Sequence, residues 1–413
     1  MKTDNKEKID EKSNLNVPHL RFPEFSGEWE KVKVSELLDF YSTNSLSWDQ
    51  LEYGTCNLMN LHYGLIHVGL PTMVDLTKDI LPNIKEDNIP NNYELCKEGD
   101  VAFADASEDT KEVAKTIEFF NLADNKIVCG LHTIHGRDNK GKTVAGFKGY
   151  AFSSTAFHNQ IRRIAQGTKI YSISTKNFSE CYIGLPSKPE QTKIAALLRL
   201  LDERIATQNK IIEDLKRLKS AIIETEYDNE GRECRIGDII VQTSFRNNNN
   251  LVETVLSVNN KLGFIKQDEQ FEDRMVASED TSNYKVVTKD DFAYNPARIN
   301  VGSIARLKSL DRGIVSPMYI CFKVVDGIVP EYLENYFATR RFFREMEKRL
   351  EGSVRLCLSF EGLCNIPISL PNIGAQTRIG MQIILLETKI KTESEILSRL
   401  EMQKQYLLYQ MFI

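Results

Sequence analysis

The sequence predicts a mixed α+β protein in which two globular domains are separated by two long helices that form an antiparallel coiled coil, with pseudo-twofold symmetry. Three observations support this fold: a repeated block, a heptad pattern in both copies of it, and short β-branched runs between the copies. Residues 185–219 and 370–404 align without a gap at a constant offset of 185, and 12 of their 35 positions are identical. Unrelated segments would share about two positions. The chain therefore carries one globule-helix unit twice.

The length of the chain also favours two similar halves, because 413 residues exceed what one hydrophobic core usually serves. No stretch approaches the ~18 to 20 consecutive apolar residues that span a bilayer, so no membrane partner is expected. Residues 1–17 are polar and charged, without the apolar region of a signal peptide, and indicate a disordered leader of a cytoplasmic protein. The expected domains are a first globule over 18–184, a helix over 185–229, a second globule over 230–369 and a helix over 370–413.

Both repeats predict helices with a coiled-coil seam. In each copy a Leu-Pro pair ends an extended segment and a Gln-Thr pair opens an apolar pattern with 4-3 spacing. The predicted seam consists of Ile194, Leu198, Leu201, Ile205, Ile212 and Leu215 in the first copy and Ile379, Ile383, Leu386, Ile390, Leu397 and Leu400 in the second.

Polar residues interrupt the seam at equivalent places, with Gln208 matching Glu393 and Lys219 matching Lys404. Such interruptions usually fix which partner register is allowed. We therefore expect the two helices to pair with each other as an antiparallel rod of roughly 50 Å. The alternative is that each helix packs on its own globule.

The two globules share landmarks in the same order. Residues 99–103 resemble 290–294, and 127–129 correspond to 314–316. Near the end of each globule, Gly167-Thr168 and Ser174 lie 185 residues before Gly352-Ser353 and Ser359. Residues 319–325 predict a strand and 330–350 a helix, so each globule is expected to mix helices and strands.

Cysteine and histidine spacing gives no sign of a metal site. None of the eight cysteines forms a C-x-x-C pair, and we expect reduced thiols that serve mainly in packing. All six histidines lie in the first half, and His132 and His135 have no cysteine or carboxylate cluster near them in the sequence. No metal ligand is expected.

The net charge of −5 argues against a uniformly basic nucleic-acid binder. A DNA-binding protein with this balance has to segregate its charges. Basic residues do cluster in 137–148, 298–312 and 340–349, although an ordinary solvated surface explains any one of these clusters equally well.

Taken together, these features resemble the specificity (S) subunit of Type I restriction-modification systems. Residues 18–25, PHLRFPEF, followed by Gly27-Glu28-Trp29, look like the N-terminal signature of that family. Residues 294–303 followed by 313–319 look like its second target recognition domain, and the two Leu-Pro-x4-Gln helices look like its spacers. The resemblance covers nearly the whole chain after about residue 17.

The resemblance implies a non-catalytic subunit that reads a bipartite, asymmetric DNA target with a fixed unread spacer and directs adenine methylation or cleavage by partner subunits. Its implied partners are double-stranded DNA, two methyltransferase (M) subunits and restriction (R) subunits. The chain would bind no cofactor itself, whereas the partners would use S-adenosylmethionine, ATP and Mg²⁺.

The motifs of a catalytic chain are absent from the sequence. Asn295-Pro296-Ala297-Arg298 lacks the second proline and the aromatic residue of an amino-methyltransferase motif, and no glycine-rich nucleotide loop occurs. No catalytic residue is therefore expected. Two alternatives remain open: a self-contained methyltransferase or nuclease with divergent motifs, and a coiled-coil scaffold.

Polar side chains between the inferred strands are the candidate DNA contacts, since such side chains can bond base edges or phosphates. The candidates for base reading are Asn57, Asn60, His62, Tyr63, Arg137 and Lys142 in the first globule and Arg246, Asn247, Arg298, Asn300, Arg306 and Arg312 in the second. The candidates for phosphate binding are Lys111, Lys148, Arg162, Arg163, Lys308 and Arg355. The candidates for M-subunit docking on the helices are Arg199, Arg204, Glu213, Arg217, Lys389, Glu395 and Arg399.

Overall fold

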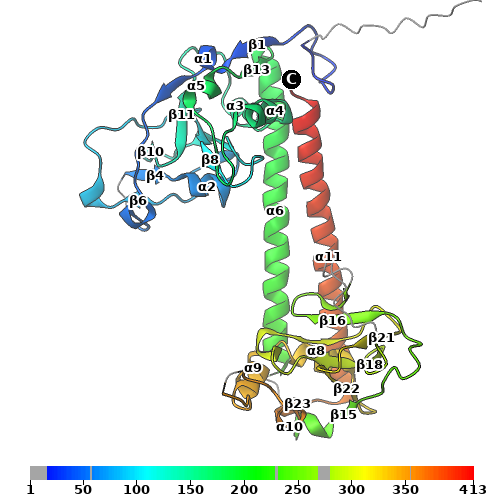
Figure 1. Ribbon diagram of the computed structural model, residues 1–413. Helices are drawn as coiled ribbons and strands as arrows, with labels where there is room; N and C mark the ends of the chain where they lie inside the picture. The colour runs from blue at the N-terminus through cyan, green and yellow to red at the C-terminus, as the bar shows by residue number, and fades with distance from the viewer. Residues whose placement is uncertain (1–15, 56–57, 228–230, 268–279, 354) are drawn as a thin grey trace, which may run out of the picture. The chain divides into compact units, whose positions relative to one another are not determined.

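The computed structural model describes residues 16–55, 58–227, 231–267, 280–353 and 355–413. Its contacts divide the chain into two compact units, whose elements are drawn in Figure 1. The first unit comprises the chain up to Asn209 together with Glu395–Ile413, and the second comprises Lys210–Ser394. Each unit therefore holds one globule, the first part of the helix that follows it and the last part of the other helix. The expected domain boundaries kept each helix whole, whereas the compact units divide both helices.

Two long helices carry the repeated block, α6 (Lys188–Tyr227) and α11 (Ile373–Gln410). Every residue of the predicted seam is buried or half-buried along them. The heptad pattern thus identifies the covered face of both helices correctly. Among the described residues, no helix is long and apolar enough to cross a membrane.

The two helices run antiparallel inside each unit. In the second unit, Lys219 Nζ lies 2.5 Å from Glu387 Oε1 and Arg378 Nη2 lies 2.9 Å from Glu226 Oε2, so the α11 numbers fall as the α6 numbers rise. In the first unit, Lys404 Nζ lies 2.6 Å from Asp202 Oδ1, and the end of the chain lies against Gly184, just before α6. The predicted antiparallel pairing is confirmed within each unit.

The described residues of the first globule form four sheets. An antiparallel pair, β1 (Glu30–Lys33) with β13 (Tyr182–Leu185), leads into α6. The five-stranded sheet has the order β2 (Asp39–Tyr41), β11 (Thr133–Arg137), β7 (Val101–Ala104), β9 (Thr116–Asn121) and β5 (Met73–Asp75). The four-stranded sheet has the order β10 (Ile127–Cys129), β4 (Met59–Leu61), β6 (Asn83–Ile84) and β3 (Leu51–Glu52), and the last sheet pairs β12 (Tyr171–Ser172) with β8 (Ala106–Ser107).

The second globule repeats this plan with different strands. The antiparallel pair β14 (Arg232–Arg235) and β23 (Pro367–Leu370) leads into α11. One sheet has the order β15 (Ile240–Thr243), β22 (Ile320–Val324), β19 (Phe292–Tyr294) and β20 (Ile304–Arg306). The other has the order β17 (Gly263–Lys266), β16 (Val255–Asn259), β21 (Arg312–Val315) and β18 (Lys285–Thr288).

The short helices before each long helix also repeat at the offset of 185. In the first unit they are α3 (Phe147–Phe152), α4 (Thr155–Ile164) and α5 (Thr175–Ser179), and in the second α8 (Pro330–Tyr336), α9 (Arg340–Glu347) and α10 (Phe360–Cys364). Ser154 and Thr339 cap equivalent helices, accepting hydrogen bonds from Phe157 N and Phe342 N. The structural repeat therefore reaches well beyond the sequence repeat.

One secondary-structure prediction needs correction. Residues 330–350 do not form a single helix, because Thr339 stops the first helical segment and caps the second. The strand expected over 319–325 is confirmed as β22.

Candidate nucleic-acid interface

The glutamine of each Leu-Pro-x4-Gln motif holds its long helix on its own globule. Gln191 Oε1 accepts a hydrogen bond of 3.0 Å from Val144 N, and its Nε2 donates to Pro186 O at 2.9 Å. Gln376 makes the same two bonds, at the same lengths, with Val329 N and Pro371 O. Both glutamines are almost fully buried. The identical glutamines thus repeat a structural connection at the offset of 185.

The far end of each long helix is held by an aromatic residue in the core of the other globule. Tyr227, at the end of α6, stacks on Tyr332 with ring centroids 4.6 Å apart. Phe412, just beyond α11, packs on Phe147 at 5.9 Å. These two contacts are again 185 residues apart in both partners. Each globule is thereby held by both helices, and its β-rich part is free to vary.

A loop at the end of each globule is also repeated. Gln166 bridges to Ser172 in the first unit, and Glu351 bridges to Cys357 in the second. Gly167 and Gly352 adopt φ angles of 138° and 116°, and a Cβ on either would clash with a carbonyl oxygen across the loop. Arg355, a candidate phosphate ligand, is exposed in the second loop. The paired glycines that the sequence places at this offset are therefore explained by a tight loop that each globule presents to solvent.

Arg137, a candidate base reader, is instead part of an internal ion-pair network. Its Nε and Nη2 donate to the two oxygens of Asp100 at 2.9 and 2.8 Å, and its Nη1 donates to Glu94 at 2.7 Å. The guanidinium also lies 4.3 Å from the ring centroid of Tyr41. Burial opposes its charge, yet the bonds to both carboxylates raise the pKa of Arg137. We therefore do not include Arg137 among the proposed DNA contacts.

Lys148, a candidate phosphate ligand, is also part of an internal ion pair. It lies 3.3 Å from the buried carboxylate of Glu118 and donates to Thr143 Oγ1 at 3.0 Å. Burial raises the pKa of Glu118, which also accepts hydrogen bonds from Gly146 N and Gly149 N. Lys148 thus neutralises an acidic group inside the globule.

Arg306, a candidate base reader in the second unit, holds a strand to α8. It bonds Glu331 at 2.7 Å and Glu334 at 3.0 Å and also pairs with Asp290. Arg306 is only 7% exposed. A buried guanidinium with three carboxylate partners is held inside the globule, so its role here is structural.

Three polar candidates are buried and bonded within their own globule. Asn60 accepts a bond from Asn44 Nδ2 at 2.7 Å, and His62 Nδ1 accepts from Gly64 N at the start of α2 (Tyr63–His67). Asn247 closes a turn through Val252 N and O. Tyr63 is half-buried, and Asn57 lies outside the described residues.

The remaining candidates lie at the surface. Lys111 and Arg162 line one cleft of about 560 Å³ in the first unit, which Lys115, His158 and Lys404 also line. Arg163 is exposed beside them on α4, and Lys142 is half-buried near Glu30 at 3.4 Å. The exposed candidates in the second unit are Arg246, Arg298, Asn300, Lys308, Arg312 and Arg355. Of these, Lys308 pairs with Glu334 at 2.7 Å and Arg246 donates to Asn283 at 2.7 Å.

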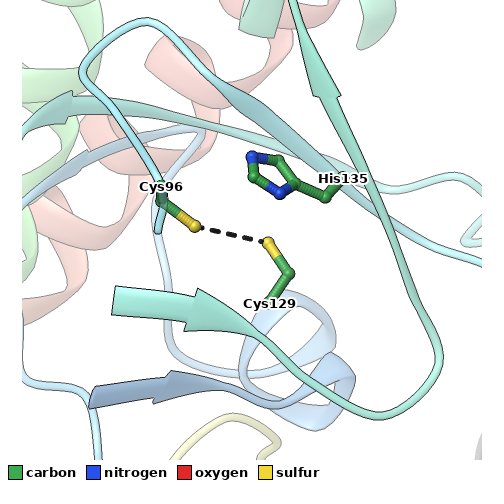
Figure 2. Close-up of side chains that lie close together, drawn as sticks. All are labelled: Cys96, Cys129 and His135. Carbon is green, nitrogen blue, oxygen red and sulfur yellow. Dashed lines mark hydrogen bonds between the residues drawn. The ribbon is translucent and has the colours of Figure 1, made fainter. Parts of the chain in front are cut away.

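A group of potential metal ligands lies inside the first globule. Figure 2 shows Cys96, Cys129 and His135 together, with one potential ligand atom from each lying within 4.8 Å of the others. Cys129 and His135 lie six residues apart, whereas Cys96 lies 33 residues before Cys129 and is brought to them by the packing of the globule.

The outer faces of the long helices carry apolar side chains as well as charges. Leu200 and Leu385 are equivalent residues at the offset of 185, and they are 59% and 69% exposed. Of the charged docking candidates, Arg199 pairs with Glu203 at 2.8 Å and Arg217 with Glu213 at 2.5 Å, one turn away on the same helix. The two helices thus present an apolar side chain to solvent at the same place in the repeat.

Comparison with known proteins gives a consistent picture. Residues 26–217 match the family model described as Type I restriction modification DNA specificity domain. The structure resembles the Type I restriction-modification S subunit from M. genitalium, with a TM-score of 0.52, 15% identity and coverage of 96% of this chain and 99% of that chain. It also resembles a chain from a study of complex assembly and conformational transition of the Type I R-M system, with a TM-score of 0.55, 16% identity and coverage of 92% and 96%. No curated protein matches the sequence.

Proposed function

Because residues 26–217 match the family model of Type I restriction modification DNA specificity domains, we infer that the chain is the DNA-specificity subunit of a Type I restriction-modification complex. The chain is non-catalytic, since in this family the enzymatic activities reside in partner subunits. A self-contained methyltransferase or nuclease and a scaffold without DNA specificity are not favoured.

One observation carries this proposal: the connections that hold each globule on the helices are repeated, whereas the β-rich parts differ. Gln191 is equivalent to Gln376, and Tyr227 is equivalent to Phe412. By contrast, the described strands of the two globules differ in number and in sequence. Dimeric regulators recognise two identical half-sites with two identical domains. Two different globules attached to the helices in the same way would recognise two different half-sites. The proposed target is therefore bipartite and asymmetric, and the helix length would set its unread spacer.

The proposed DNA contacts are the candidates that remain at the surface. In the first unit they are Tyr63, Lys111, Lys142, Arg162 and Arg163, and in the second Arg246, Arg298, Asn300, Lys308, Arg312 and Arg355. Asn57 also remains a candidate. The lysines and arginines among them suit phosphate binding and would add salt-dependent affinity to an otherwise acidic chain.

The proposed partners are two M subunits, which the exposed helix faces around Leu200 and Leu385 would receive, and R subunits. The M subunits would use S-adenosylmethionine, and the R subunits would use ATP and Mg²⁺. The complex would act on DNA in the cytoplasm.

The test is to map methylated adenines in a host without this system, with the chain expressed beside its M subunits. The proposal expects one bipartite motif, which disappears when the chain is omitted. Methylation that persists without the chain, or a motif that consists of one continuous half-site, would contradict it.

A further inference from the structure

The strongest unassigned feature is the group formed by Cys96, Cys129 and His135 in the first globule (Figure 2). Cys96 lies in the segment before β7, Cys129 ends β10, and His135 lies on β11. The three residues thus come from both large sheets of the globule. All three side chains are at least 95% buried, because their exposures are 5%, 1% and 0%.

The histidine has the hydrogen bonding of a metal ligand. His135 Nε2 bonds to Asp100 Oδ2 at 2.7 Å, while the buried Nδ1 has no hydrogen-bond partner. In Figure 2 one ring nitrogen faces the side of the cysteine sulfurs. Histidines that bind metals almost always donate their other N–H to a carboxylate, a backbone carbonyl or water, which fixes the free nitrogen as the ligand. Without an ion, the buried Nδ1 would lack the hydrogen bond that a buried polar atom requires.

The spacing of the sulfurs also fits a metal. Sγ of Cys96 and Sγ of Cys129 lie 3.6 Å apart. Zn–S bonds of ~2.3 Å at the tetrahedral angle hold two sulfurs about 3.8 Å apart, whereas a disulfide requires ~2.05 Å. A disulfide would also leave His135 Nδ1 without a partner. The arrangement therefore favours a bound ion over a bond between the cysteines.

The second globule does not repeat this set of side chains at the equivalent place. By the landmarks that the globules share, Val287, four residues before Asp291, corresponds to Cys96, and Cys321, opposite Ala293, corresponds to His135. Both lie in an apolar cluster and are fully buried. By the same landmarks, the half-buried Ser316 corresponds to Cys129. The three equivalent residues of the second globule thus include one cysteine and no histidine, so the ligand set belongs to the first globule.

The charges around the cluster balance once an ion is bound. Two thiolates offset a divalent ion, the imidazole is neutral, and the Asp100 carboxylate is matched by Arg137. Both thiols lose their protons as the ion binds.

We propose that Cys96 Sγ, Cys129 Sγ and His135 Nδ1 bind a zinc ion, with water in the fourth position. Binding releases the two thiol protons to solvent. The ion fastens the segment before β7 and the end of β10 to β11, and so joins the two large sheets of the first globule. It sets the position of Asn60 and of the loop that follows β10, beside the first globule's candidate DNA contacts.

The test uses the full chain, purified under reductant after removal of any affinity tag. The expected metal content is about one zinc ion per chain. After exchange, cobalt(II) is expected to show thiolate charge-transfer absorption and the intense visible bands of a tetrahedral site. Cys129→Ser and His135→Ala are expected to lose the zinc, and Asp100→Asn to weaken binding by ~10- to 100-fold.

Cys181→Ser and Cys321→Ser are the matched controls, because both remove a buried cysteine elsewhere, and both are expected to keep the zinc. The cobalt spectrum of the wild-type chain decides the question even if a variant fails to fold. Absence of both zinc and thiolate–cobalt absorption in the wild type would overturn the proposal. So would a Cys96–Cys129 disulfide in the reduced preparation, or full zinc content in Cys129→Ser.

Discussion

Lys404 pairs with Asp202 in the first unit at 2.6 Å, and Lys219 pairs with Glu387 in the second at 2.5 Å. The two ion pairs are equivalent, because Lys219 and Lys404 are 185 residues apart, as are Asp202 and Glu387. The lysines that interrupt the apolar seam therefore have partners on the opposite helix. They fix the antiparallel register within each unit.

Reversing the charge of Lys404 should loosen the first unit. Lys404→Glu places two acidic groups together at a site about 20% exposed, and we expect a loss of about 1 kcal/mol of unfolding free energy. Adding Asp202→Lys should restore most of it. Thermal unfolding measures both changes, with the exposed Lys391→Glu as the control that should have little effect. No rescue in the double variant would mean that the pair does not set the register.

Removing the repeated glutamine should weaken the attachment of α6 to the first globule. Gln191→Leu leaves Val144 N and Pro186 O without this buried partner, and we expect a cost of about 2 kcal/mol. Gln376→Leu should cost a similar amount in the second unit. Chemical unfolding reports the loss, and the exposed Gln403→Leu should be nearly neutral. If Gln191→Leu and Gln403→Leu unfolded alike, the proposed role of the motif would be wrong.

The loop after β11 should respond to acid through Asp138. Burial alone raises the pKa of this carboxyl, but hydrogen bonds from Thr143 outweigh that effect and lower it from 3.8. Because the folded pKa is depressed, the stabilisation is fully present above the unfolded pKa and is lost as the pH falls through the folded value.

We expect Asp138→Asn to cost about 1 kcal/mol near pH 7. The difference from wild type should shrink below about pH 4. Unfolding measured across this range checks the sign, with Asp124→Asn as an exposed control. A difference that grows towards acid would contradict the assignment.

The basic cleft of the first unit should bind phosphate rather than read bases. Lys111→Ala with Arg162→Ala should weaken DNA binding by the complex with M subunits and reduce the salt slope by about one for each lost contact. The methylated motif should stay the same, because phosphate contacts carry no base information. Binding assays at several salt concentrations test this, and Lys97→Ala, outside the cleft, is the control. A changed motif would show that the cleft contacts bases.

Local patterns predict the repeated frame well. The seam and the Leu-Pro-x4-Gln motif are contiguous in sequence, so periodicity and identity locate them without tertiary information. The correspondence of residues 99–103 with 290–294 also holds, since Asp100 and Asp291 both accept a bond from the backbone three residues earlier.

Long-range pairing is what the sequence does not reveal. Arg137 and Arg306 look like surface cations because their acidic partners lie many residues away and are joined to them only by the packed sheets. Cys96 and Cys129 are separated for the same reason by 33 residues.

The central claim is that the two globules read separate half-sites at a spacing set by the long helices. Its most direct test duplicates one equivalent heptad in each helix, residues 203–209 in α6 and 388–394 in α11, and maps methylated adenines in a host without the native system. An insertion of about 10 Å should lengthen the unread spacer by about three base pairs and leave both half-sites unchanged. Altered half-sites, or an unchanged spacer in an active complex, would contradict the account.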